Sequence, residues 1–501
     1  MVAHCAFKDA AGNTPFENPK LYGTAVTPDF AYRLRPTGGE HTTPDDGVLH
    51  GVPSTLQRLG SPQIHQHCDA RGMFTELRLS EDFGPGSVLV VRTKLVDFKP
   101  NLDWKIRTCA DDAVSRLTLG ALNAALYRCD AEERDTIGEG VYDVPKLGTL
   151  AYCGIQGWYT HLKHIIPNND LGHPLCDHLR QGNWALDYVV NRLHGYSEFY
   201  PEIAPLSAWF EERWALVKRV PNFLIPRYFA LTMHTAYQAL VHRALKLMPG
   251  KVVSSSRFTH ELALTSVQLL GHVSSTGLRP INEEKAHSSM SAGLPHFTTH
   301  HMRCWGRDVF IALEGLLLAT GRFADAREHI LAFGSTLKHG LIPNLLDSGR
   351  FPRYNARDAT WFWLQAVQSY CAMSSEGLSF LDVSVPRRFP DGETFVEWDS
   401  DEAFSRSSTV AELMHEIMER HARGISFREW NAGPALDSQM RDEGFNVQIG
   451  VDFAANGFVS GGNRWNCGTW MDKMGSSDKA GIRGVPATPR DGADVEIVGL
   501  Q

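Results

Sequence analysis

The sequence predicts a mainly α-helical fold built from helical hairpins, preceded by a smaller region that contains β-strands. From about residue 111 onward, apolar residues recur with the 3.6-residue period of helices that bury one face. Short links join successive helical segments, so neighbouring helices are expected to be antiparallel. The longer loops between them are rich in Gly, Asn, Trp and Asp, and we expect these loops to carry the function.

The β-containing region is expected to span residues 1–105, and the helical domain 106–501. The first segment is rich in Gly, Pro and Thr. Its clearest element is the run at 87–96, which is short, apolar and dominated by β-branched residues, and which predicts a buried strand.

Nine helices are expected in the second region. In the segment 308–320, Val309, Leu313 and Leu317 share one face of a helix, and Gly321 follows as a natural stop. The same reasoning places the nine helices at 111–129, 177–194, 207–219, 225–248, 259–274, 308–320, 323–338, 358–373 and 409–422.

Composition and charge exclude several classes of function. The formal net charge is −8, which does not supply the clustered basic residues that nucleic acids or anionic membranes require. No secretory signal is visible, and the longest apolar stretch is about ten residues, too short to span a bilayer. Nine cysteines without a CxxC pair indicate a reducing compartment. We therefore expect a soluble, cytosolic protein without nucleic-acid or membrane partners.

No cofactor or metal site is predicted. The sequence contains neither GxGxxG nor GxxxxGK[ST], the loops that cradle nucleotide phosphates. His296 and His300 are four residues apart, but no carboxylate or cysteine completes a recognisable zinc spacing. The 12 Trp and 13 Tyr residues suit sugar rings, although a large core needs aromatic residues as well.

Four loop motifs place carboxylates beside Trp, Arg and Asn. Sugar hydroxyls need carboxylate or amide partners, and hydrolysis of a glycosidic bond needs two carboxyl groups, one of which donates a proton. These motifs predict a carbohydrate site. They lie at 303–308 (RCWGRD), at 341–346 (LIPNLL) with 353–363 (RYNARDATWFW), at 427–433 (FREWNAG) with 442–446 (DEGFN), and at 461–472 (GGNRWNCGTWMD) with 488–492 (TPRDG) and Glu496.

A simpler interpretation exists for two of the carboxylates. Asp308 and Asp358 each lie where a helix is expected to begin, and an aspartate there is an ordinary N-cap. The positive helix end and the neighbouring Arg307 or Arg357 favour the ionised form. A general acid needs the opposite, so Asp358 has to be desolvated, for example by Trp361, if it is to donate a proton.

Together the motifs resemble a known family. Residues 304–310, 339–346, 353–361, 431–434, 442–446 and 461–475 are similar to the C-terminal glucosidase half of eukaryotic glycogen debranching enzymes, and the strings at 152–158 and 169–176 also match. The resemblance covers roughly 110–501 and is weaker before 105. It implies an (α/α)6 barrel and amylo-1,6-glucosidase activity, the inverting hydrolysis of the α-1,6-linked glucose left at a branch of glycogen or limit dextrin. The family's 4-α-glucanotransferase half is absent from this chain.

The resemblance also implies roles for individual residues. It makes Asp358 the general acid and places the general base, a glutamate, beyond Gln501. Trp430 stands where the family usually has Arg, which affects the sugar contacts of that loop. Candidate residues lining the glucose pocket are Trp305, Arg307, Asp308, Asn344, Arg357, Trp470 and Asp472.

Two alternatives remain open at this point. The chain ends in the apolar run 495–501, so we expect a truncated chain whose barrel is incomplete. Such a chain is consistent with a non-catalytic glycogen-binding fragment. Another (α/α)6 glycoside hydrolase, such as a trehalase-like enzyme, is the second alternative.

Overall fold

The computed structural model describes residues 102–501, apart from 167, 169, 171, 280–286 and 489–490, together with four strands nearer the N-terminus. The chain divides into two units, residues 1–101 and 102–501. In the first unit, β1 (Asp29–Leu34) pairs antiparallel with β4 (Leu89–Lys94), and β2 (Gln63–Asp69) pairs with β3 (Gly72–Arg78). The strand expected at 87–96 is therefore present as β4.

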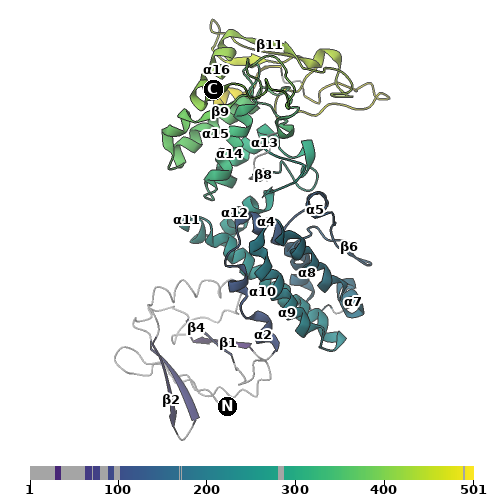
Figure 1. The fold of residues 1–501 in the computed structure, drawn as a ribbon, viewed down its shortest axis with the longest axis vertical. Coiled ribbons are helices and arrows are strands. Elements are labelled where there is room, and N and C mark those ends of the chain that lie inside the picture. Colours follow the sequence, from purple (N-terminus) through teal and green to yellow (C-terminus); the bar gives the residue numbers. More distant parts are fainter. Residues whose placement is uncertain are drawn as a thin grey trace. The chain divides into compact units, whose positions relative to one another are not determined.

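The second unit is mainly α-helical, as the sequence predicts. A first group of helices packs around the longest of them, α10, which contacts α2, α3, α6, α9 and α12 (Figure 1). This group consists of α2 (Leu102–Arg107), α3 (Ala110–Val114), α4 (Leu119–Leu126), α5 (Asp130–Ile137), α6 (Ile155–Ile165), α7 (Pro174–Gln181), α8 (Trp184–Ser197), α9 (Ala204–Val217), α10 (Ile225–Lys246), α11 (Gly250–Val253) and α12 (Arg257–Leu269).

Two of the expected helices are wrong as single elements. The segment 111–129 is broken because the Ser115 hydroxyl donates back to the Asp112 carbonyl (2.7 Å), and Thr118 then caps a new helix by accepting from the Ala121 N–H. The segment 177–194 is broken at Gly182, whose backbone is fully extended. Side-chain hydrogen bonds to the backbone compete with helix continuation at such positions.

A second group of helices carries the loop motifs. It consists of α13 (Gly306–Leu313), α14 (Phe323–Ser335), α15 (Ala359–Met373), α16 (Val410–Arg423) and α17 (Val495–Leu500). The expected helix 308–320 is α13 followed by one wider π-helical turn, Glu314–Leu318. Helices α13 and α15 pack closely against each other, so their N-terminal ends can place two loops together (Figure 1).

Short strands and single turns of 3-10 helix fill the connections. Strands β11 (Ile425–Arg428), β12 (Asn446–Val451), β13 (Val459–Gly461) and β14 (Gly492–Ala493) form an antiparallel sheet in that order. The remaining strands form pairs, namely β5 (Asp143–Val144) with β6 (Gly148–Thr149), β7 (Leu270–Gly271) with β8 (Ser289–Met290), and β9 (Ser384–Pro386) with β10 (Ser407–Thr409).

Three apolar cores hold the second unit together. The first extends from Ile106 to Val267, the second is built mainly from α13 to α16, and the third packs the β11–β14 sheet against Trp361 and Ile497. Burial of apolar surface on this scale is the main favourable contribution to folding. The buried cysteines Cys129, Cys153 and Cys304 are free thiols, as expected.

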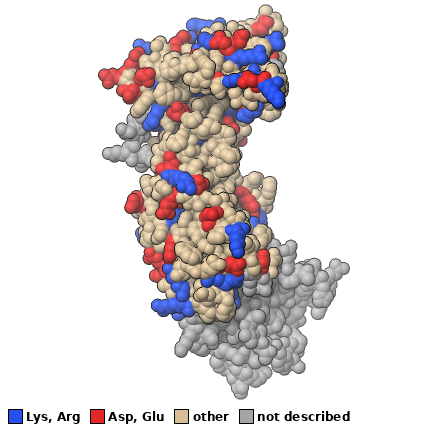
Figure 2. All heavy atoms as spheres, turned by 90° about the vertical axis from the view of Figure 1, so that its right-hand side faces the viewer, with Lys and Arg blue, Asp and Glu red and all other residues tan. Residues whose placement is uncertain are grey.

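Figure 2 shows acidic and basic side chains interspersed over the face in view. Among the described residues, no helix combines the length and the apolar character needed to cross a bilayer.

Candidate active site

The loops that precede α13 and α15 are joined by backbone hydrogen bonds. Leu345, in the loop after α14, forms antiparallel bridges with both Trp305 and Arg353. The Gly306 N–H donates to the Asn344 carbonyl (2.6 Å), and the Arg357 N–H donates to the Gly468 carbonyl (2.8 Å). Motifs that are up to 165 residues apart in the sequence therefore meet at one place.

Arg307 is the centre of this place. Its guanidinium binds Asp358 through two hydrogen bonds, Nε to Oδ2 (2.6 Å) and Nη2 to Oδ1 (3.0 Å). The third nitrogen, Nη1, donates to Oδ2 of Asp472 (3.0 Å). The Arg307 backbone N–H donates to Oδ1 of Asn344 (3.1 Å), so that one residue joins three of the four motifs. Bidentate pairs of this kind fix the geometry of a carboxylate.

Asp358 is desolvated, as proton donation requires, and its side chain does not cap the helix. It occupies the N-cap position of α15, but its side chain makes no capping hydrogen bond. Its carboxylate is fully buried, and its ion pair is with Arg307 on α13. The helix start thus brings Asp358 to the Arg307 site, where its side chain pairs with the guanidinium and does not cap the helix.

Burial changes the acidity of two carboxyl groups. Desolvation raises the pKa of Asp358, and the opposing effect of the Arg307 charge does not cancel it. Desolvation thus outweighs the Arg307 charge, which favours the ionised form of Asp358. Desolvation also raises the pKa of Asp308, although part of that side chain is exposed to solvent. A higher pKa keeps a larger fraction of each carboxyl group protonated, and a general acid must be protonated to donate.

The other residues predicted to line a glucose pocket surround this group to different degrees. Asn344 is buried, and Trp305 is half-buried with its indole N–H donating to the Met302 carbonyl (2.7 Å). Arg357 is buried and Trp470 is half-exposed. Asp308 makes no ion pair within the described part of the chain.

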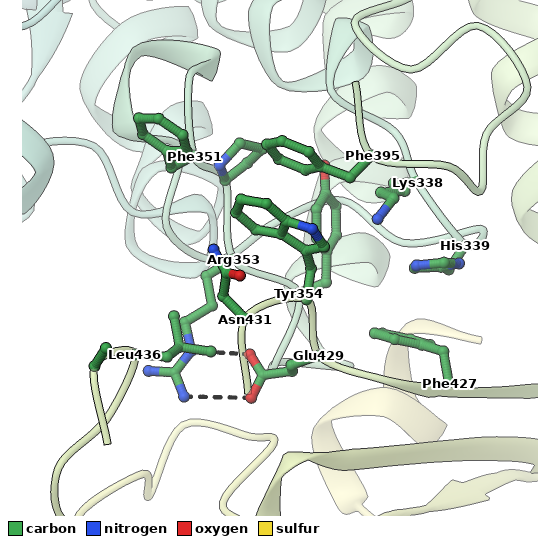
Figure 3. A pocket seen from close by; sticks show the side chains of 13 residues that line it. Lys338, His339, Phe351, Arg353, Tyr354, Phe395, Phe427, Glu429, Asn431 and Leu436 are labelled. Carbon is green, nitrogen blue, oxygen red and sulfur yellow. Dashed lines mark hydrogen bonds and ion pairs between the residues drawn. The ribbon is translucent and has the colours of Figure 1, made fainter. Parts of the chain in front are cut away.

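The 427–433 motif forms part of a separate cavity of about 450 Å³ (Figure 3). Glu429 binds Arg353 there through two hydrogen bonds (2.9 and 3.3 Å). Sequence reasoning singled out the loop but missed Lys338, which is buried in the cavity wall. Lys338 is the last residue of the helix expected at 323–338, three residues beyond the end of α14. It gave no signal in the sequence, because a lysine is also expected on a solvated helix end.

Metal-binding geometry is lacking throughout the residues that the structure describes. No three His, Cys, Asp or Glu side chains in 102–501, outside the gaps, come together in a way that could hold an ion. The Arg307 site instead balances its carboxylates with a guanidinium.

Comparison with known proteins gives the family. Residues 1–193 match the model of the central domain of human glycogen debranching enzyme, and residues 264–501 match the amylo-alpha-1,6-glucosidase model. The chain is 48% identical over 473 residues to glycogen debranching enzyme of Saccharomyces cerevisiae, covering 94% of this chain. The chain belongs to the glycogen debranching enzyme family.

The Arg307 site lies in one of the two matched regions of the chain. Arg307, Asp358 and Asp472 all lie inside the segment that matches the amylo-alpha-1,6-glucosidase model. The chain spans about a third of the length of the yeast relative, 30% of it. What the whole relative does is therefore a separate question from what this segment contributes.

Proposed function

We propose that this chain provides the amylo-1,6-glucosidase site of a glycogen debranching enzyme. Its substrate would be the single α-1,6-linked glucose at a branch point of glycogen or limit dextrin. The observation that carries the proposal is the joint binding of Asp358 and Asp472 by Arg307, within the part of the chain that matches the glucosidase family. Asp358 is buried, whereas Asp472 is partly exposed. Different environments give two carboxyl groups different acidities, so Asp358 can donate a proton while Asp472 stays ionised and binds sugar hydroxyls.

Asp358 acts in this proposal as the general acid. Its proton passes to the glycosidic oxygen as the bond from that oxygen to the anomeric carbon breaks, and water attacks the opposite face of the sugar. Inversion also needs a second carboxylate about 6.5–9.5 Å away that takes a proton from the water. Arg307 holds Asp358 in position.

The remaining predicted residues bind the glucose in this scheme. Asp308 and Asp472 have oxygens that solvent reaches, so they can accept hydrogen bonds from sugar hydroxyls. Trp305 and Trp470 offer ring faces, while Asn344 and Arg357 position the loops on which the acids lie.

We further propose that residues 106–501 form part of an (α/α)6 barrel after a linking region at 1–105, and that the protein acts in the cytosol. The close packing of α13 against α15 supports paired helices, and the buried free thiols support a reducing compartment.

One observation favours binding without hydrolysis as the second candidate function. The bidentate pair with Arg307 stabilises the ionised form of Asp358, and an ionised carboxylate cannot donate a proton. In that case the same residues hold a glucan chain and release no glucose.

Glucose release from a phosphorylase limit dextrin tests the proposal. The assay compares a full-length debranching enzyme containing this segment with its Asp358→Asn and Asp187→Asn variants, where Asp187 is an exposed control in the first turn of α8. General acid catalysis is worth about 10²–10⁴-fold, so Asp358→Asn should lose that much and Asp187→Asn nothing. Near-normal release by Asp358→Asn would remove this residue from the mechanism. Cleavage of trehalose in place of the branch would support the trehalase-like alternative.

A further inference from the structure

The cavity beside the 427–433 motif is built differently from the Arg307 site and shares no lining residue with it. It is about 450 Å³ in volume, large enough for a sugar unit. Its lining includes the aromatic residues Phe351, Tyr354, Phe395, Phe427 and Trp430, and its polar side chains come from three separate segments (Figure 3). The lining residues used below are Lys338, Phe395, Phe427, Glu429, Trp430 and Asn431.

Lys338 is the feature that points to a ligand. Its side chain is only 4% exposed, yet its amino group forms no hydrogen bond or ion pair with any residue described in the structure. The rings of Phe389 and Phe395 lie against it, with centroids 5.3 and 5.9 Å from Nζ, and the Asp391 carboxylate is close enough to act on its charge without forming an ion pair with it. Figure 3 shows the amino group at the cavity wall. Burying an ammonium group without a partner is costly, so a ligand that accepts its hydrogen bonds would offset that cost.

Flat apolar ring faces also line the cavity. The Trp430 indole stacks on Phe395 with ring centroids 3.6 Å apart and an interplanar angle of 8°. Trp430 remains 43% exposed to solvent. On another wall, Phe427 stacks on His339 at 4.1 Å. Rigid aromatic platforms of this kind suit the apolar face of a pyranose ring.

The charges of the walls favour a neutral ligand over an anion. Arg353 is already bound by Glu429 and by Asp437 (3.4 Å), so its charge is compensated. Glu429 is buried in the wall, where it would repel a phosphate. Its carboxylate oxygens retain lone pairs that can accept from hydroxyl groups, and the Asn431 amide adds a donor and an acceptor.

We propose that this cavity is a second saccharide subsite, which binds a glucose unit of an α-glucan chain. Trp430 and Phe395 pack against the ring, the Lys338 ammonium donates to its hydroxyl oxygens, and Glu429 accepts from its hydroxyl groups. This inference rests on the proposed function, because it assigns the cavity to the same glucan substrate. The subsite would hold the chain while the Arg307 site holds the terminal glucose.

Calorimetric binding of maltohexaose to the 501-residue chain tests the subsite. Lys338→Met and Trp430→Ala should each weaken binding by about tenfold or more, since each removes charge-assisted hydrogen bonds or a ring platform. The matched controls are Lys246→Met and Trp184→Ala, which change exposed residues of α10 and α8 and should leave affinity within about twofold. Thermal melts establish that each variant is folded, and Trp430→Ala, at a half-exposed position, is the variant least dependent on that check.

Two results would overturn the subsite. Unchanged maltohexaose affinity in both cavity variants would show that the sugar binds elsewhere. Displacement of maltohexaose by millimolar inorganic phosphate would show that the Lys338 wall is an anion site. Asp358→Asn should retain maltohexaose binding, so loss of glucose release with intact binding bears on the proposed function and leaves the subsite standing.

Discussion

Two buried arginines four positions apart, Arg303 and Arg307, have opposite surroundings. Arg303 is completely buried and donates to Glu132 (2.8 Å), to the Ser289 hydroxyl (2.8 Å), and to the carbonyls of Ser289 (2.7 Å) and Thr298 (2.8 Å). Most of its partners are therefore neutral, and one carboxylate balances its charge. The group joins α5 of the first helical group to the segment that leads into α13.

Arg307 instead divides its charge between two carboxylates, and a third lies next to it in the sequence. Asp358 is buried, but the Asp472 side chain is 26% exposed and Asp308 reaches solvent. Lys473 also pairs with Asp472 (3.0 Å), so three carboxylates face two cations. The remaining excess of acid, which solvent reaches on one side, is unfavourable for stability and useful for binding hydroxyl groups. The comparison teaches that charge balance and access to solvent, more than burial itself, distinguish a structural ion pair from a site.

The largest expected change in stability would come from breaking the ion pair between Arg303 and Glu132. Glu132→Gln keeps the shape of the side chain but leaves the Arg303 charge buried without a counterion, which costs about 3–5 kcal/mol of unfolding free energy. Urea unfolding of the 501-residue chain measures it, with Glu139→Gln, at an exposed position after α5, as the control. A loss below about 1 kcal/mol would show that the hydrogen bonds of Arg303 do not fix the segment that leads into α13.

Replacing Lys338 should change the unfolding free energy less than Glu132→Gln does, and should raise it. Desolvation lowers the pKa of Lys338 to about 8, from 10.5 in an unfolded chain, so the unfolded chain binds more protons between these values. Stability of the native protein should therefore rise with pH from 8 to 10, and Lys338→Met should abolish that rise. The same variant should be more stable than the native protein at pH 7 by about 1–3 kcal/mol. A destabilised Lys338→Met protein would reveal a compensating partner for the ammonium group.

The smallest effect is expected at Asp308. Because burial raises the pKa of this carboxyl, the folded protein binds more protons than the unfolded chain just above pH 3.8, and stability falls as the pH rises through that window. Asp308→Asn lacks this loss, so its melting temperature should exceed that of the native protein at pH 7 and match it near pH 3. Asp187→Asn, in the first turn of α8, controls for the general loss of one charge. Equal melting temperatures at pH 7 would argue that solvent screens Asp308 completely.

Periodicity in the sequence predicted the helices whose apolar faces are long and regular. The expected helix 225–248 is α10, Ile225–Lys246, and 409–422 is α16, Val410–Arg423. It missed α5, which is polar along most of its length. That helix is held by contacts distant in the sequence, such as Glu132 with Arg303, and no local pattern reports these. The barrel and the domain boundary remain predictions.

The candidate site was predictable as a set of residues but not as a geometry. The motifs, together with the family resemblance that they carry, singled out Arg307, Asp358 and Asp472, which the structure joins. It did not identify which arginine binds Asp358, because Arg357 is adjacent in the chain whereas Arg307 reaches it only when α13 packs against α15. Lys338 was missed because its burial depends on rings from distant segments.

The most direct test of the account compares Arg303→Lys with Arg307→Lys in a full-length enzyme that contains this segment. A lysine cannot reproduce the several directed hydrogen bonds of the guanidinium at either position. Arg303→Lys should lower the unfolding free energy by several kcal/mol while the folded enzyme still releases glucose from limit dextrin. Arg307→Lys should reduce that release by about 100-fold or more, with a smaller change in stability. Normal glucose release by Arg307→Lys, with the larger stability loss at that position, would contradict the assignment of the Arg307 site to function.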